Sequence, residues 1–159
     1  MDENENGGGS RNTTLYASSC RSLRSCCCFI HTHAHTANTF DEKERYLSSV
    51  IQVLQNDPLL RTGTANLRAH VLRAQTRYEY GMLDDALRDV SEALATTTTF
   101  PMESSSLVGR AWRTQADCHV ALQHVEEAEY ALRQWAMCDP SCRTKAMKEI
   151  QALRESSSL

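Results

Sequence analysis

Glycine and proline are scarce in this sequence, with 6 and 3 residues among 159, and aromatic residues make up only 6%. Together with the abundance of Ala, Leu, Arg and Glu after Asp41, this scarcity favours helices. The chain also lacks a run of the roughly 18 apolar residues that a membrane-spanning helix needs. We therefore expect one all-α domain, soluble or at most peripherally attached to a membrane.

The chain has no strong excess of charge of either sign, since its formal net charge is -3 at pH 7. Such a balance provides no general attraction to nucleic acid, so we expect no nucleic-acid partner, and any basic surface must be local. The 7 cysteines are odd in number and irregularly spaced, which argues against a disulfide framework. A reducing compartment, the cytoplasm, is the expected location.

Common catalytic motifs are missing as well. The sequence has no glycine-rich phosphate loop, no Gly-x-Ser-x-Gly elbow and no His-Glu-x-x-His helix. Cys118 and His119 are adjacent on an expected helix, where neighbours point about 100° apart, so they are poorly placed as a nucleophile and base. Cys138 and Cys142 lack the second ligand pair of a zinc site. We expect no enzyme and no cofactor.

The composition changes near residue 40. Residues 1–40 are rich in Ser, Thr, Cys and His and hold few apolar residues, so we expect a disordered arm. Helical periodicity begins at Asp41, where Glu44 completes the spacing of a capping box, and Gly81 suits the left-handed end of a helix. The expected helices are 41–56, 66–80, 83–95, 106–122, 125–137 and 142–155, followed by a tail at 156–159.

Two segments of this helical region repeat each other. The stretch from His70 aligns with the stretch from Trp112 without a gap across two helices. Small residues recur where closely packed helices need them. The aligned pairs are Ala74 with Ala116, Leu83 with Val125, Ala86 with Ala128, Val90 with Leu132, and Leu94 with Ala136.

This repeat resembles the tetratricopeptide repeat (TPR), whose pattern includes W-x2-L-G-x2-Y, then A-x3-F, then P over about 34 residues. Trp112, Ala116, Ala128, Leu132 and Pro140 match it in the second copy. The copies are spaced about eight residues wider than this period, and the Thr/Ser-rich segment 96–106 accounts for the excess. The resemblance implies repeats at 67–100 and 107–142, a degenerate half-repeat at 41–56 and a capping helix at 142–155. The antiparallel pairs would form a short right-handed superhelix.

The resemblance also implies a concave groove that binds a peptide or a helix of a partner protein, as in an adaptor or co-chaperone-type scaffold. Its arginines would favour an acidic segment. Of the positions that grip a C-terminal carboxylate in chaperone-binding members of the family, only Lys148 is basic here. Two clear copies fall below the three that usually stand alone, so a homodimer is one further expectation. The implied groove residues are Arg68, Val71, Gln75, Tyr78, Arg110, Arg113, Asp117 and Lys148.

The arm contains one unusual stretch, "SCCCFIHTHAHT" at residues 25–36, for which four interpretations remain open. Its thiols and imidazoles suit zinc or copper, although their spacing does not fix a tetrahedral site. The cysteines beside Arg21 and Arg24 are also candidates for acylation, which would bring the chain to a membrane. The stretch could equally direct the chain to an organelle, or belong to a low-complexity tail without a fixed role. The candidate metal ligands are Cys26, Cys27, Cys28, His31, His33 and His35.

Overall fold

The computed structural model describes residues 30, 39–61, 63–96 and 105–157, and every regular element in this part of the chain is helical. The expected all-α class is therefore confirmed for these residues. The elements are α3 (Phe40–Asn56), α4 (Pro58–Arg61), α5 (Thr64–Glu79), α6 (Leu83–Ala95), α7 (Ser105–Ala121), α8 (Val125–Cys138), the 3-10 helix η3 (Pro140–Cys142) and α9 (Arg143–Ser157).

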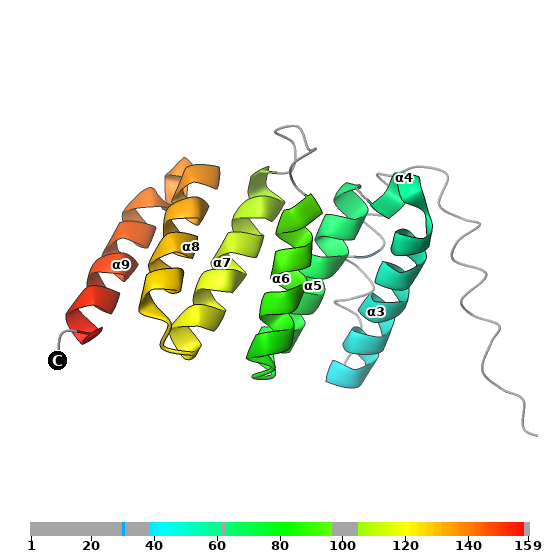
Figure 1. Cartoon of the computed structure of the whole chain (residues 1–159), viewed down its shortest axis with the longest axis horizontal. Coiled ribbons are helices and arrows are strands. Elements are labelled where there is room, and N and C mark those ends of the chain that lie inside the picture. Colours follow the sequence, from blue (N-terminus) through cyan, green and yellow to red (C-terminus); the bar gives the residue numbers. More distant parts are fainter. Residues whose placement is uncertain (1–29, 31–38, 62, 97–104, 158–159) are drawn as a thin grey trace, which may run out of the picture.

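The helices stand side by side in an elongated array, with α3 at one end and α9 at the other (Figure 1). The most extensive packing occurs within two pairs, α5 with α6 and α7 with α8. Between the pairs, α6 packs on α7 and α5 also contacts α7, while α3 and α9 cover the two ends of the array. Successive long helices run in opposite directions, so α5 and α7 run in the same direction (Figure 1). The arrangement is that of a helical repeat.

The turn inside each pair has the same backbone geometry. Gly81 has φ 77° and Gln123 has φ 61°, and these two residues occupy equivalent positions in the two pairs. In both turns, the residue after the left-handed one donates its backbone N–H to the carbonyl of the residue five positions before it. This is the hydrogen-bond pattern of a Schellman motif. The bonds are Met82 N to Arg77 O at 2.9 Å and His124 N to His119 O at 2.8 Å. The left-handed turn expected at Gly81 is confirmed, and its partner turn forms without a glycine.

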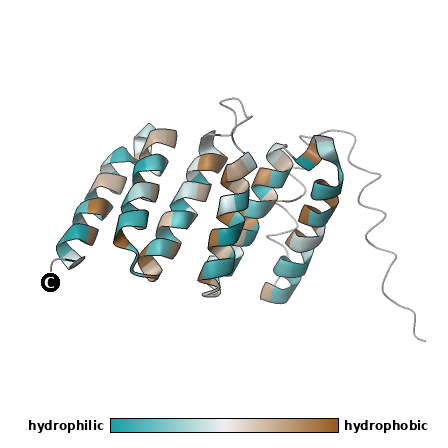
Figure 2. Cartoon of the chain, in the orientation of Figure 1, coloured by the Kyte–Doolittle hydropathy of each residue, from teal (hydrophilic) through white to brown (hydrophobic). Residues whose placement is uncertain are grey.

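Small buried residues bring the paired helices close together. Ala74, Ala86, Ala116 and Ala128 are each no more than 1% exposed. Around them, Val90 packs with Val71 and Leu107 in one core cluster, and Leu132 packs with Trp135 and Ile150 in another. Hydrophobic and hydrophilic residues alternate around each helix, as Figure 2 shows. Most of the aligned apolar residues are therefore buried, while Leu83, Leu94 and Val125 are partly buried.

The first helix begins earlier than expected. The capping box was expected at Asp41 and Glu44, but the structure forms it at Thr39 and Glu42. The N–H of Glu42 donates to Oγ1 of Thr39 at 3.3 Å, and the N–H of Thr39 donates to Oε2 of Glu42 at 3.4 Å. Asp41 instead lies in the first turn, where a carboxylate favourably faces the positive end of the helix. The short helix α4 was not expected either. It begins at Pro58, because proline is tolerated in the first turn of a helix.

A residue of the Cys/His-rich arm belongs to the core. Ile30 is 4% exposed and packs in the first core cluster with Leu47, Ile51 and Leu72. The rest of the expected disordered arm, residues 1–29 and 31–38, lies outside the described residues, as does most of the expected loop insertion, 97–104. Among the described residues, the core thus reaches back beyond the predicted boundary at residue 40 through Ile30.

Candidate functional site

The candidate site is the face that α5 and α7 present together. Arg68 on α5 and Arg110 on α7 each lie six residues before an equivalent buried alanine, so they occupy the same register position in the two helix pairs. Gln75 and Asp117 are equivalent in the same way, and all four side chains are half-buried. Because α5 and α7 run in the same direction and contact each other, these residues belong to neighbouring helices of one face.

At the level nearer the start of both helices, the face is positively charged. Arg110 donates from Nη2 to Oε1 of Gln75 at 2.8 Å, so its side chain reaches across from α7 to α5. Burial lowers the pKa of Arg110, and the nearby charge of Arg68 lowers it further. The Nε of Arg68 is buried and has no hydrogen-bond partner among the described residues. We call Arg68, Gln75 and Arg110 the cationic end.

At the other level, the face is rich in carboxylates. Arg113 pairs with Asp117 at 2.8 Å and with Glu149 of α9, and its guanidinium lies 4.8 Å from the ring centre of Trp135. The pKa of Asp117 is raised because burial and the charge of Glu149 outweigh Arg113. The pKa of Arg113 is also raised, because its two carboxylate partners outweigh its burial. The pKa of Arg113 thus reflects two carboxylates sharing one guanidinium, whereas that of Asp117 reflects its burial first. We call Arg113, Asp117 and Glu149 the acidic end.

Tyr78 and Val120 complete the face beside the acidic end. They are equivalent in the two pairs and are 36% and 43% exposed, so both offer apolar surface to a ligand. The pKa of Tyr78 is raised, first by burial and then by the neighbouring charge of Asp117. The phenol therefore stays protonated at neutral pH and can donate or accept a hydrogen bond.

Two of the residues predicted for the groove, Val71 and Lys148, make none of the contacts described above. Val71 is fully buried, at 0% exposure, in the core cluster between α5, α6 and α7, so its prediction as a ligand contact is wrong. Val71 is buried because both α6 and α7 pack against α5. Lys148 is exposed on α9, a helix that packs chiefly on α8. Its neighbour Glu149, which the sequence did not single out, is the residue of α9 that reaches Arg113.

Comparisons of the chain with family models, with curated proteins and with solved structures gave no match. No relative therefore supplies a function or a ligand. The TPR resemblance stays a prediction from the sequence, and what the chain binds has to follow from its own side chains.

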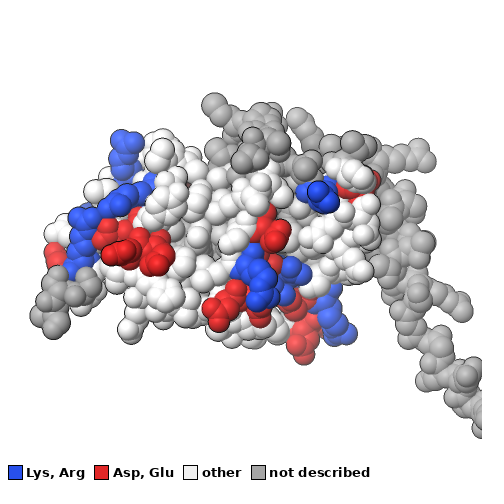
Figure 3. Space-filling view, viewed as in Figure 1, with Lys and Arg blue, Asp and Glu red and all other residues white. Residues whose placement is uncertain are grey.

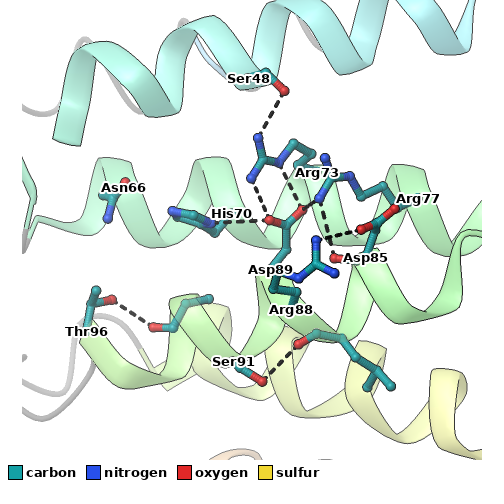
Figure 4. A network of polar contacts seen from close by, with 12 residues as sticks. Ser48, Asn66, His70, Arg73, Arg77, Asp85, Arg88, Asp89, Ser91 and Thr96 are labelled. Carbon is teal, nitrogen blue, oxygen red and sulfur yellow. Dashed lines mark hydrogen bonds and ion pairs between the residues drawn. The ribbon is translucent and has the colours of Figure 1, made fainter. Parts of the chain in front are cut away.

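A second polar cluster is buried between α3, α5 and α6 (Figure 4). Its centre is Asp89 of α6, which is 2% exposed. Arg73 binds both carboxylate oxygens of Asp89 at 2.9 and 2.6 Å, and Arg77 binds one at 3.0 Å and also pairs with Glu44 of α3. Two positive and two negative charges therefore balance. We call this set of four the ionic cluster.

The ionic cluster determines the charge state of Asp89. Burial raises the pKa of this carboxyl, but the neighbouring His70 and the hydrogen bonds and charges of Arg73 and Arg77 outweigh burial, so the net shift is downward. The His70 Nδ1 lies 3.6 Å from Asp89, which is longer than a hydrogen bond, so we attribute the lowering chiefly to the arginines. Arg73 also donates to Ser48 of α3 at 2.9 Å. This cluster joins three helices and leaves no open ligand position, so its role is structural.

A signal for the ionic cluster was present in the sequence. Asp89 is equivalent to Ala131, which is buried in the second pair, so a charged residue stands where the register requires a buried one. Arg73 and Arg77 lie four residues apart and hence share one face of α5. Glu44 carries no such local signal, because 33 residues separate it from Arg77.

The described cysteines and histidines do not assemble a reactive or metal-binding centre. Among the described residues, no group of three or more His, Cys, Asp or Glu side chains could hold a metal ion. Cys118 is buried, and burial raises its pKa to about 11, so its thiol remains protonated and is a poor nucleophile. The candidate metal ligands of the arm, Cys26 to Cys28 with His31, His33 and His35, lie outside the described residues. None of the described helices is long and apolar enough to cross a membrane.

Proposed function

We propose that the chain is a protein–protein interaction module, a TPR-like adaptor or co-chaperone-type scaffold without enzymatic activity. In this proposal the antiparallel pairs continue into a short right-handed superhelix, and a peptide or helix of a partner protein lies along the face of α5 and α7. The observation that carries the proposal is the repetition of this face. Arg68 with Arg110 and Tyr78 with Val120 recur in register, and all four stay accessible at least in part.

The face shown in Figure 3 differs from the α5 and α7 face in how its charges are paired. Its charged side chains gather in groups of mixed sign, one toward the α9 end and another near the middle of the array. On α6, Arg88 pairs with Asp85, and Glu129 of α8 pairs with both Arg133 and Arg154. These exposed pairs satisfy each other and are worth little individually. They are typical of a solvated surface, so the α5 and α7 face remains the better candidate for a partner.

The chemistry of the proposed face suits a peptide better than a small molecule. Binding groups are spread along two helices, with arginines at one end and the exposed Tyr78 and Val120 at the other. Tyrosine and arginine are also the residue types that contribute most at protein interfaces. We expect an extended or helical segment that spans both ends of the face.

A site-specific photo-crosslinking experiment tests the proposal. A photoreactive phenylalanine replaces Tyr78 in the full chain, and the same residue replaces Tyr130 of α8 as a matched control, since Tyr130 is 54% exposed. In a lysate of the cells that make the protein, position 78 is expected to capture a distinct partner that position 130 does not. Capture from position 130 alone, or equal capture from both positions, would contradict binding along α5 and α7.

A further inference from the structure

The half-buried arginines in the described part of the chain fall into two groups. Arg73 and Arg77 bind Asp89, and Arg113 binds Asp117 and Glu149, so each of these three has a carboxylate partner. Arg68 and Arg110 are also half-buried, but neither has a carboxylate partner among the described residues. The cationic end is therefore an exception to the way this protein compensates its buried charges.

Leaving these two arginines unpaired is unfavourable in the free protein. The buried Nε of Arg68 has lost its water without gaining an acceptor. Arg110 has one neutral acceptor, Gln75, and faces the like charge of Arg68. An ionised carboxylate has two oxygens and only accepts hydrogen bonds, so one held between the two guanidinium groups would offset both charges.

We propose that Arg68 and Arg110 together hold a carboxylate of an Asp or Glu residue in the partner segment. This inference rests on the proposed function, because it specifies the ligand of the same face. It also gives the ligand a direction. The acidic residue lies over the cationic end, near the starts of α5 and α7, and the segment continues toward Tyr78. The opposite placement is less favourable because Arg113 is already paired with Asp117 and Glu149.

The test uses hexaglutamate as the probe and hexaglutamine as its neutral control, added to the full chain at low ionic strength. The Nε–Hε signals of the arginine side chains are followed by NMR. Hexaglutamate is expected to shift the signals of Arg68 and Arg110, and Arg113 should respond less because it already has two carboxylate partners. Added salt should weaken the effect. Hexaglutamine should produce no comparable shift.

Two variants determine whether binding depends on the pair. Arg68→Gln and Arg110→Gln are each expected to weaken hexaglutamate binding about tenfold, the loss of roughly one charge-assisted hydrogen bond. Arg88→Gln removes the same charge from an exposed position on α6 and should change affinity less than twofold, roughly the level of a surface pair. Equal weakening by all three variants would overturn the proposal, as would shifts caused by inorganic phosphate when hexaglutamate causes none.

Failure of this inference is distinguishable from failure of the proposed function. If position 78 crosslinks a partner and the Arg68→Gln, Arg110→Gln double variant captures it equally well, the face binds a partner but not through a carboxylate at the cationic end. If position 78 captures no partner that position 130 does not, the proposed function itself fails.

Discussion

Removing an arginine from the cationic end should stabilise the free protein. In Arg68→Met, the unbranched methionine keeps much of the packing of the arginine stem and removes a buried donor that has no partner. An unsatisfied buried donor costs about 1–3 kcal/mol. After allowing for lost contacts, we expect the free energy of unfolding to increase by about 1 kcal/mol, and Tm to rise by about 4 °C.

The matched control lies on the same face. Arg113→Met removes a guanidinium that binds Asp117 and Glu149 and stacks on Trp135, and it leaves two carboxylates close together. We expect a loss of about 1–3 kcal/mol in this variant, the usual cost of unpairing a hydrogen bond to a charged group. Both variants lose one positive charge, so their opposite signs cannot come from net charge.

Urea unfolding followed by circular dichroism at neutral pH measures both changes, and differential scanning fluorimetry gives Tm. The measurement uses the full chain without added peptide, because a bound carboxylate would restore the arginine's contribution. A loss of stability in Arg68→Met similar to that in Arg113→Met would refute the reasoning. It would mean that Arg68 is satisfied in the folded protein and that the cationic end is an ordinary solvated surface.

Three further predictions concern the fold. Asp89→Asn should cost about 3 kcal/mol at neutral pH, because it breaks a buried ion pair. The pKa of Asp89 in the folded protein lies below its ordinary value, so the stabilisation is complete above the ordinary pKa and is lost as the pH falls through the folded pKa. Urea unfolding should therefore show the stability difference between wild type and variant narrowing below about pH 4. Gly81→Ala should lower the stability by about 1 kcal/mol in thermal unfolding, because Gly81 has a φ of 77°. Gln123→Gly at the equivalent turn should lose no stability. Equal losses of stability in the two variants would contradict the strain argument. Ile30→Ala should cost about 2 kcal/mol by urea unfolding, and an unchanged midpoint would mean that Ile30 does not pack in the core.

Local sequence signals predicted the helices and their turns well. Glycine at position 81 signalled a left-handed turn directly, whereas the equivalent turn at Gln123 was predictable only from the repeat register. The start of α3 was predicted two residues late, because the expected capping box at Asp41 and Glu44 forms instead at Thr39 and Glu42. Contacts within the folded chain accompany the earlier start, including the packing of Phe40 against Tyr80 with ring centres 4.5 Å apart.

The candidate site was predictable only in part. The TPR resemblance implied that Arg68, Gln75 and Arg110 share one face, and the structure brings them together. The resemblance could not tell how far neighbouring helices cover that face, which is why Val71 was assigned to the groove although it is buried. It also could not predict which arginines find carboxylates, because the partner Glu149 is 36 residues away from Arg113. Charge compensation of this kind depends on tertiary contacts.

The two helix pairs have similar backbones but different interiors, and this difference has a spectroscopic consequence. The first pair is centred on the ionic cluster, whereas both tryptophans of the chain, Trp112 and Trp135, lie in the second. Tryptophan fluorescence therefore reports on the second pair alone, while circular dichroism reports on all helices. In Asp89→Asn, coincident transitions by the two signals would mean that the pairs unfold as one unit. A fluorescence transition that follows the helical one would instead identify the second pair as a separately stable unit.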